Sequence, residues 1–289
     1  MNKQEKIQYA YSLTKQIKIK LLKENSPHVI MNEHEYLREV MTLYAKQTNL
    51  LHSTLILLNN NHAEEAYILL RSILSNSMLI NYLCKDNKRK DRYENYLIQP
   101  NKAELSFLYD IREAARKGWV EKTDALEEKI REHEEFLINN GFTTRNKKEE
   151  IIADTWFLSI RRMALTDKYF FFIYMLFYKE SSEYEHSDFM SLSIYRQQII
   201  NEISGTVTFK LNLTKTNPEL SEKVLNLSII IYSVTFEEIF KHIKRRHPQM
   251  FSKEQLTELD NIRSGMSENA IHFPYDISEE TFASEETKQ

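Results

Sequence analysis

The stretch from His62 to Cys84, HAEEAYILLRSILSNSMLINYLC, decides the expected fold. Between Ala66 and Cys84 the only charged residue is Arg71, and the apolar residues fall on both sides of a helix instead of forming one stripe. A helix that is apolar nearly all round belongs in the interior of a protein. We therefore expect a central helix, in which Arg71 is held by a carboxylate or other acceptors from a neighbouring helix, because an unpaired buried cation is very costly.

The composition predicts an all-α protein. Only four glycines and five prolines occur in 289 residues, too few for the turns of an all-β fold. Apolar residues recur at helical spacing along most of the chain. The predicted helices span residues 4–24, 32–59, 62–84, 87–117, 121–139 and 151–163, a stretch from Asp167 onward, 218–247 and 252–267. No strand pattern stands out, so a sheet is not expected.

The predicted architecture is a bundle of long antiparallel helices around the central helix at about 62–84. Residues 1–275 are expected to form a single helical domain. Within it, residues 87–150 make a peripheral excursion that folds as a helical hairpin. The acidic tail, residues 276–289, is expected to be flexible.

Several classes of function have no support in the sequence. The net charge of −3 gives no general attraction to nucleic acid, and the single cysteine, Cys84, excludes a disulfide framework. A glycine-rich phosphate loop and a serine nucleophile elbow are absent, and His62 with Glu65 is an isolated metal-like spacing. No cofactor and no metal are therefore expected. The absence of a signal peptide or a bilayer-length apolar run predicts a cytoplasmic protein with no membrane partner.

One set of polar residues has the spacing of a catalytic or binding site. Tyr178, Ser182 and His186 are four residues apart and share one face of a helix. We expect this helix to pack against the central helix, so that the three side chains lie near Arg71. A phenol, a hydroxyl and an imidazole beside an arginine suit acid–base chemistry or phosphate binding. The alternative is a polar network that only fixes the register of the helices.

A second candidate is the basic helix end KHIKRRH, residues 241–247. Its cations Lys241, Lys244, Arg245 and Arg246 form the one patch suited to the phosphates of a nucleic acid. Cations are also favoured near the C-terminus of any helix by the helix dipole, so a structural role is the alternative.

Three segments resemble a bacterial family of all-helical proteins of unknown function: AEEAYILLRSIL at 63–74, DRYENYL at 91–97 and YKESSEYEHSD at 178–188. In that family an Arg-Ser helix is usually followed by a glutamate, and a later helix carries a Tyr-x3-Ser-x3-His pattern. Arg71-Ser72 and Tyr178, Ser182 and His186 match, whereas Ser75 stands where the acid is expected. The resemblance covers roughly residues 35–215, and Glu183 or Glu185 is the alternative acid.

The fold is also similar in outline to HEPN-type helical bundles, which recur in toxin and antiphage systems, often as ribonucleases. Their Arg-x4–6-His motif is absent at all nine histidines. The resemblance implies an RNA-acting protein in bacterial or prophage defence, with a ribonuclease-like activity left open. The alternative is a non-catalytic helical module that binds a protein partner or a small ligand. RNA or another protein is the expected partner, and a homodimer is an open alternative.

Overall fold

The computed structural model describes residues 1–24, 26, 35–86, 91–145, 158–185, 195–200, 203, 205–211 and 217–268. The chain divides into two compact units. Unit 1 comprises Met1–Cys84 and Phe172–Gln289, and unit 2 comprises Lys85–Phe171. The division into one domain with an excursion over 87–150 stays a prediction, and the tail at 276–289 lies outside the described residues.

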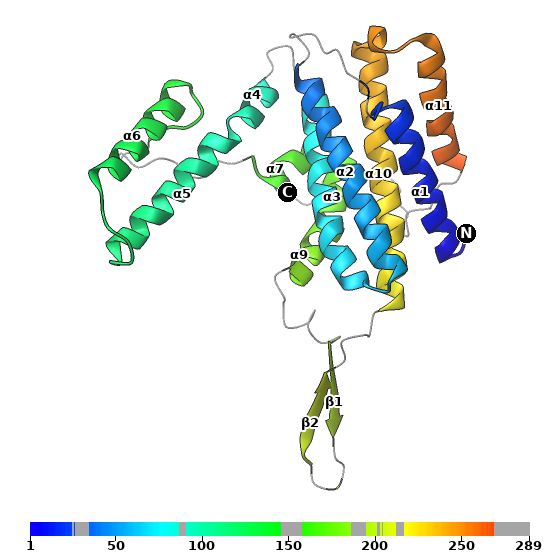
Figure 1. Ribbon diagram of the computed structural model, residues 1–289, viewed down its shortest axis with the longest axis horizontal. Coiled ribbons are helices and arrows are strands. Elements are labelled where there is room, and N and C mark those ends of the chain that lie inside the picture. The colour runs from blue at the N-terminus through cyan, green and yellow to red at the C-terminus, as the bar shows by residue number, and fades with distance from the viewer. Residues whose placement is uncertain are drawn as a thin grey trace, which may run out of the picture. The chain divides into compact units, whose positions relative to one another are not determined.

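Unit 1 is a bundle of long helices with α3 at its centre (Figure 1). Its helices are α1 (Lys3–Lys20), α2 (Glu35–Asn59), α3 (Ala63–Cys84), the π-helical turn η3 (Tyr174–Tyr178), α9 (Lys179–Glu185), α10 (Pro218–Arg246), the 3-10 turn η5 (Pro248–Met250) and α11 (Lys253–Glu268). Helix α3 packs against α2, α10 and α9. Residues on several of its sides, including Tyr67, Leu70, Ile73 and Leu74, are fully buried. The prediction of a central apolar helix in an all-α fold is confirmed.

Local sequence signals set several helix ends as expected. Helices α2 and α3 form a hairpin, whose turn at the three asparagines 59–61 holds Asn61 at φ +61°. Helix α11 begins at a capping box, because Gln255 N–H donates to the Ser252 hydroxyl and Ser252 N–H donates to the Gln255 side chain. No helix within the described ranges is long and apolar enough to cross a bilayer.

A cluster of buried polar side chains joins the three main helices of unit 1. The Gln47 amide of α2 donates to the Ser77 hydroxyl of α3 at 2.9 Å and lies 3.3 Å from the Thr235 hydroxyl of α10. Beside it, the Tyr44 and Tyr232 rings stack with centroids 4.9 Å apart. Directional bonds of this kind favour one register of the helices over slipped alternatives.

Unit 2 is also helical. It contains α4 (Asp91–Leu97), α5 (Gln99–Arg116), α6 (Asp124–Asn139), α7 (Ile160–Ala164) and the start of α8 (Lys168–Ile173), whose first residues precede the division at Phe171. Helices α5 and α6 form the predicted hairpin around a small apolar core that includes Leu105, Ile130 and Leu137. The helix predicted over 87–117 is interrupted before Pro100, because α4 ends at Leu97 and α5 begins at Gln99. Most of the helix predicted at 151–163 lies outside the described residues.

The expectation of no sheet is wrong. Strands β1 (Arg196–Ile200) and β2 (Val207–Leu211) form an antiparallel two-stranded ribbon in unit 1 (Figure 1). Gly205 lies in the turn between them at φ +69°, a backbone conformation that glycine adopts readily. The strands are five residues each, and β1 begins with three polar residues, so neither gives the long alternation by which strands are recognised. The second strand, VTFKL, does alternate and is the signal that was missed.

Candidate functional site

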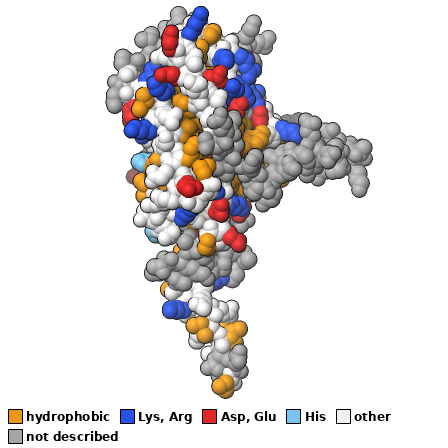
Figure 2. Space-filling model, turned by 90° about the vertical axis from the view of Figure 1, so that its right-hand side faces the viewer, with side chains coloured by type: hydrophobic (Ala, Val, Ile, Leu, Met, Phe, Trp, Pro, Cys, Tyr) orange, Lys and Arg blue, Asp and Glu red, His pale blue; other side chains and the backbone are white. Residues whose placement is uncertain are grey.

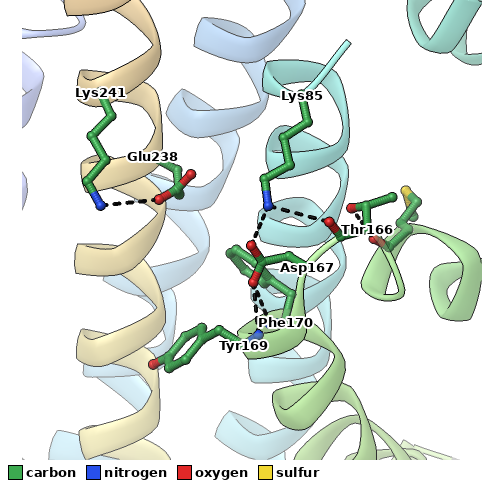
Figure 3. Close-up of polar contacts among 8 residues, drawn as sticks. Lys85, Thr166, Asp167, Tyr169, Phe170, Glu238 and Lys241 are labelled. Atoms are coloured by element: carbon green, nitrogen blue, oxygen red, sulfur yellow. Dashed lines mark hydrogen bonds and ion pairs between the residues drawn. The ribbon is translucent and has the colours of Figure 1, made fainter. Parts of the chain in front are cut away.

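The helix that carries the predicted site begins at a well-defined cap. The Asp167 carboxylate accepts N–H bonds from Tyr169 at 2.9 Å and Phe170 at 3.2 Å, and the Lys85 ammonium bonds to the same carboxylate (Figure 3). Burial opposes ionisation of this carboxyl group, but these hydrogen bonds outweigh it and hold the pKa of Asp167 below its ordinary value. The start predicted at Asp167 is confirmed, since α8, η3 and α9 follow without a break.

The middle of this helix is a π-helical turn, η3, which a sequence pattern does not reveal. Such turns are rare and occur frequently at functional sites. The turn starts at Tyr174 and ends at Tyr178, and the two rings stack with centroids 5.4 Å apart and planes at 25°. Both side chains are half-buried, so the pair is an aromatic surface within reach of solvent.

Arg71 of α3 lies against this aromatic pair. Its guanidinium carbon is 4.8 Å from the centroid of the Tyr178 ring, which is the geometry of a cation–π interaction. The structure therefore brings together two of the predicted site residues, from α3 and η3. The expectation of a fully buried cation is wrong, because Arg71 is half-buried. Its long aliphatic stem lets the charged end reach past the apolar helix interface.

The other predicted members of this site are only partly described. Ser182 lies in α9 and is half-buried, four residues beyond Tyr178. Its neighbour Ser181 is buried, and its hydroxyl donates to the Tyr178 carbonyl at 2.9 Å. His186 lies outside the described residues, as do the side chains of Glu183 and Glu185. The predicted proximity of Arg71 and His186 therefore stays a prediction.

Three neighbours of this site were not predicted. Lys223 of α10 pairs with Glu180 of α9 at 2.6 Å, and its ammonium is 5.7 Å from the centroid of the Tyr67 ring. Tyr67 precedes Arg71 by four residues and so shares its helix face, a spacing that could have identified it. Lys223 and Glu180 gave no local signal, because their pairing joins distant parts of the chain. We call this set the Arg71 cluster: Tyr67, Arg71, Tyr174, Tyr178, Glu180 and Lys223.

Carboxylates lie close to part of the basic helix end, which the sequence of residues 241–247 alone does not indicate. Lys241 donates to Glu237 at 2.9 Å, one turn back on α10. Its ammonium also lies 3.5 Å from the Glu238 carboxylate (Figure 3). The hydrogen bond to Glu237, together with the charges of both glutamates, raises the pKa of Lys241.

Lys244 lies 3.8 Å from the carboxylate of Asp260 on α11, and Lys244, Arg245 and Arg246 are all exposed. Two of the four predicted phosphate-binding cations are thus close to carboxylates.

The two histidines of this segment point inward. His242 and His247 are 8% and 3% exposed, and each places Nε2 beside the Tyr36 hydroxyl, at 2.9 and 2.5 Å. One phenol can donate to one imidazole and accept from the other. Burial, followed by the charges of His247, Arg246 and Arg245, lowers the pKa of His242 to about 4, although a hydrogen bond with the Cys84 backbone acts in the opposite direction.

Metal ligation has no support in the part of the chain that the structure describes. No group of three or more His, Cys, Asp or Glu side chains there has the arrangement of a metal site. His62 and Glu65, the isolated spacing in the sequence, form an exposed pair with 3.8 Å between Nδ1 and the carboxylate.

Comparison with known proteins gives a family without an assigned activity. No curated protein and no solved structure matches the chain. A family model described as a family of unknown function does match, over residues 39–201. The matched range includes Arg71, Tyr178, Ser182 and His186 but ends before the basic helix end at 241–246. Because the match spans more than half of its length, this chain belongs to the family of unknown function DUF5677.

Proposed function

We propose that this protein binds RNA through the Arg71 cluster. The observation that carries the proposal is the guanidinium of Arg71 against Tyr178, on a π-helical turn that also presents Tyr174. Single-stranded RNA is bound by aromatic rings that stack on its bases and by arginines that contact its bases and phosphates. We further propose, from the resemblance of the sequence to HEPN-type bundles alone, that the protein acts in a bacterial or prophage defence setting.

The chemistry of the Arg71 cluster suits this ligand. An arginine that stacks its planar face on a ring still directs N–H donors outward from its edge, where a phosphate oxygen can accept them. Lys223 lies in the same cluster with its charge paired to Glu180. Half-burial of Tyr174 and Tyr178 limits hydration of the site and strengthens the attraction of the Arg71 charge for phosphate.

Replacement of Arg71 by glutamine is expected to weaken RNA binding about tenfold, because one charge and one stacked cation are lost. Fluorescence anisotropy with a labelled single-stranded oligoribonucleotide measures the change. The matched control is Arg112→Gln, which removes a guanidinium stacked 4.4 Å from the Tyr109 ring in unit 2. Equal affinities of the wild type and Arg71→Gln would contradict the proposed site.

The basic helix end is proposed as a second contact with the RNA backbone. Replacement of Lys244, Arg245 and Arg246 by glutamine is expected to reduce the slope of log K against log salt concentration by about 2, since three phosphate contacts are lost. Filter-binding titrations at several salt concentrations test this. An unchanged slope would remove this helix end from the RNA-binding surface.

The second candidate function is a non-catalytic module that binds a protein partner or a small ligand. It is favoured by the carboxylates that pair with Lys223, Lys241 and Lys244. Incubation of the protein with RNA separates the candidates. Binding that Arg71→Gln weakens supports the first, and cleavage lost in the same variant adds a ribonuclease activity to it. Absence of both binding and cleavage favours the second.

A further inference from the structure

The ribbon of β1 and β2 has one mostly apolar face. Opposed residues in an antiparallel pair project to the same side, so the register sorts the ten strand residues into two sets. One face carries the pairs Ile200–Val207, Gln198–Phe209 and Arg196–Leu211, and the other carries Ile199–Thr208 and Gln197–Lys210. We call the first set the apolar face of the ribbon.

This apolar face is open to solvent. Ile200, Val207, Phe209 and Leu211 are 62%, 55%, 70% and 63% exposed. Figure 2 shows hydrophobic side chains on the surface at the lower end of the molecule, where Figure 1 places the strands. A two-stranded ribbon is marginal in water unless its apolar side packs against something. The exposed face therefore indicates a surface that another protein surface covers.

We propose that the apolar face of a second copy of this chain covers it, giving a symmetric dimer of two stacked ribbons. The distribution of charge fits such a pairing. Phe209 lies at the centre of the face, and its only charged residue, Arg196, lies at one end. Stacking with opposite strand directions places the Arg196 end of one copy over the Ile200 end of the other, so the arginines stay apart. Lys210 remains hydrated on the outer face.

The size of the face sets the strength of this dimer. Four apolar side chains that are each more than half exposed would bury on the order of 400 Å² per copy. A stable interface of standard size buries about 800 Å² per partner. The ribbon dimer is therefore expected to be weak and to depend on protein concentration, with a dissociation constant of about 10–100 μM. It involves none of the Arg71 cluster, so it stands independently of the RNA-binding proposal.

Sedimentation velocity of the full chain tests the dimer at concentrations from about 1 to about 200 μM, a range that brackets a weak association. The weight-average mass of the wild type is expected to rise from monomer toward dimer. Phe209→Glu, which puts a charge at the centre of the apolar face, is expected to stay monomeric throughout. Thr208→Glu is the matched control, because it adds the same charge one residue away on the opposite face, and it should follow the wild type.

Other outcomes would overturn the proposal. A wild type that stays monomeric at every concentration would show that a different molecule covers the face. A Phe209→Glu protein that still dimerises, or a loss of dimer in Thr208→Glu equal to that in Phe209→Glu, would place the interface elsewhere. Val207→Glu supplies an independent variant near the other end of the face and should also be monomeric. Far-ultraviolet circular dichroism checks that the helices are intact, since no substituted residue lies in a helix.

Discussion

Replacement of Tyr232 by alanine is expected to lower the free energy of unfolding by about 3–5 kcal/mol, as large aromatic-to-alanine changes in protein cores do. The ring is fully buried on α10 and stacks on Tyr44 of α2 with centroids 4.9 Å apart. Its hydroxyl lies 2.8 Å from the Thr48 hydroxyl. Truncation would leave a cavity between α2 and α10 and remove one of the two hydrogen bonds of the Thr48 hydroxyl, which also donates to the Tyr44 carbonyl. Urea denaturation followed by circular dichroism measures the loss.

Two milder substitutions separate the contribution of the Tyr232 ring to stability from that of its hydroxyl. Tyr232→Phe keeps the stacked ring and is expected to cost about 1 kcal/mol, the net contribution of one buried hydrogen bond. Thr48→Val removes the other partner of the same bond. In a double-mutant cycle the two losses should be non-additive, because the groups are in contact. A loss below about 1 kcal/mol for Tyr232→Ala would contradict the argument, because it would mean that the core closes over the missing ring.

Acidification is expected to destabilise unit 1 through His242. Burial, His247 and the two neighbouring arginines lower the pKa of this imidazole to about 4 in the folded protein, whereas it is near 6.5 in an unfolded chain. Between these values the unfolded chain binds a proton that the folded protein does not, so stability falls as the pH falls. The stabilisation that comes from keeping His242 neutral is fully present above pH ~6.5. About 3 kcal/mol of the free energy of unfolding is lost by pH ~4.

The same unfolding measurement between about pH 7 and pH 4 checks this expectation. Carboxyl groups titrate in every variant, so the comparison is between the wild type and His242→Gln. The variant should be less stable than the wild type at neutral pH, because the bond with Tyr36 is changed, and should lose less stability on acidification. Parallel profiles for the two proteins would show that His242 is not the responsible group.

The fold could be predicted where a single helix carries a strong signal. Helix α3 is apolar nearly all round, so its central place follows from its sequence alone. The lone charge of Arg71 similarly predicted a contact with the aromatic helix, and the structure confirms one with Tyr178. Neither result depended on knowing how distant helices are aligned.

The features that were missed depend on such alignment or on very short elements. Lys223 and Glu180 are 43 residues apart and meet only because α9 packs near α10. His242 and His247 read as part of a basic patch, but the end of α10 turns both toward Tyr36. Five-residue strands give too little alternation to outweigh a helical context. Hydrophobic periodicity therefore predicts the helices from the sequence. The pairs that polar side chains form can be identified only from the folded structure.

The π-helical turn makes the Arg71 cluster depend on backbone conformation as well as on residue identity. Such a turn accommodates one residue more than the same stretch of α-helix. If the residues of η3 formed a regular α-helix without the loss of one residue, everything beyond them would rotate by about 100° around the helix axis. Tyr178 and α9 would then face another direction, although every side chain was kept. Deletion of one residue would instead restore a regular helix and leave the direction of α9 nearly unchanged. Within the family, a gap of one position at this turn would therefore mark proteins in which a regular helix keeps the orientation of α9.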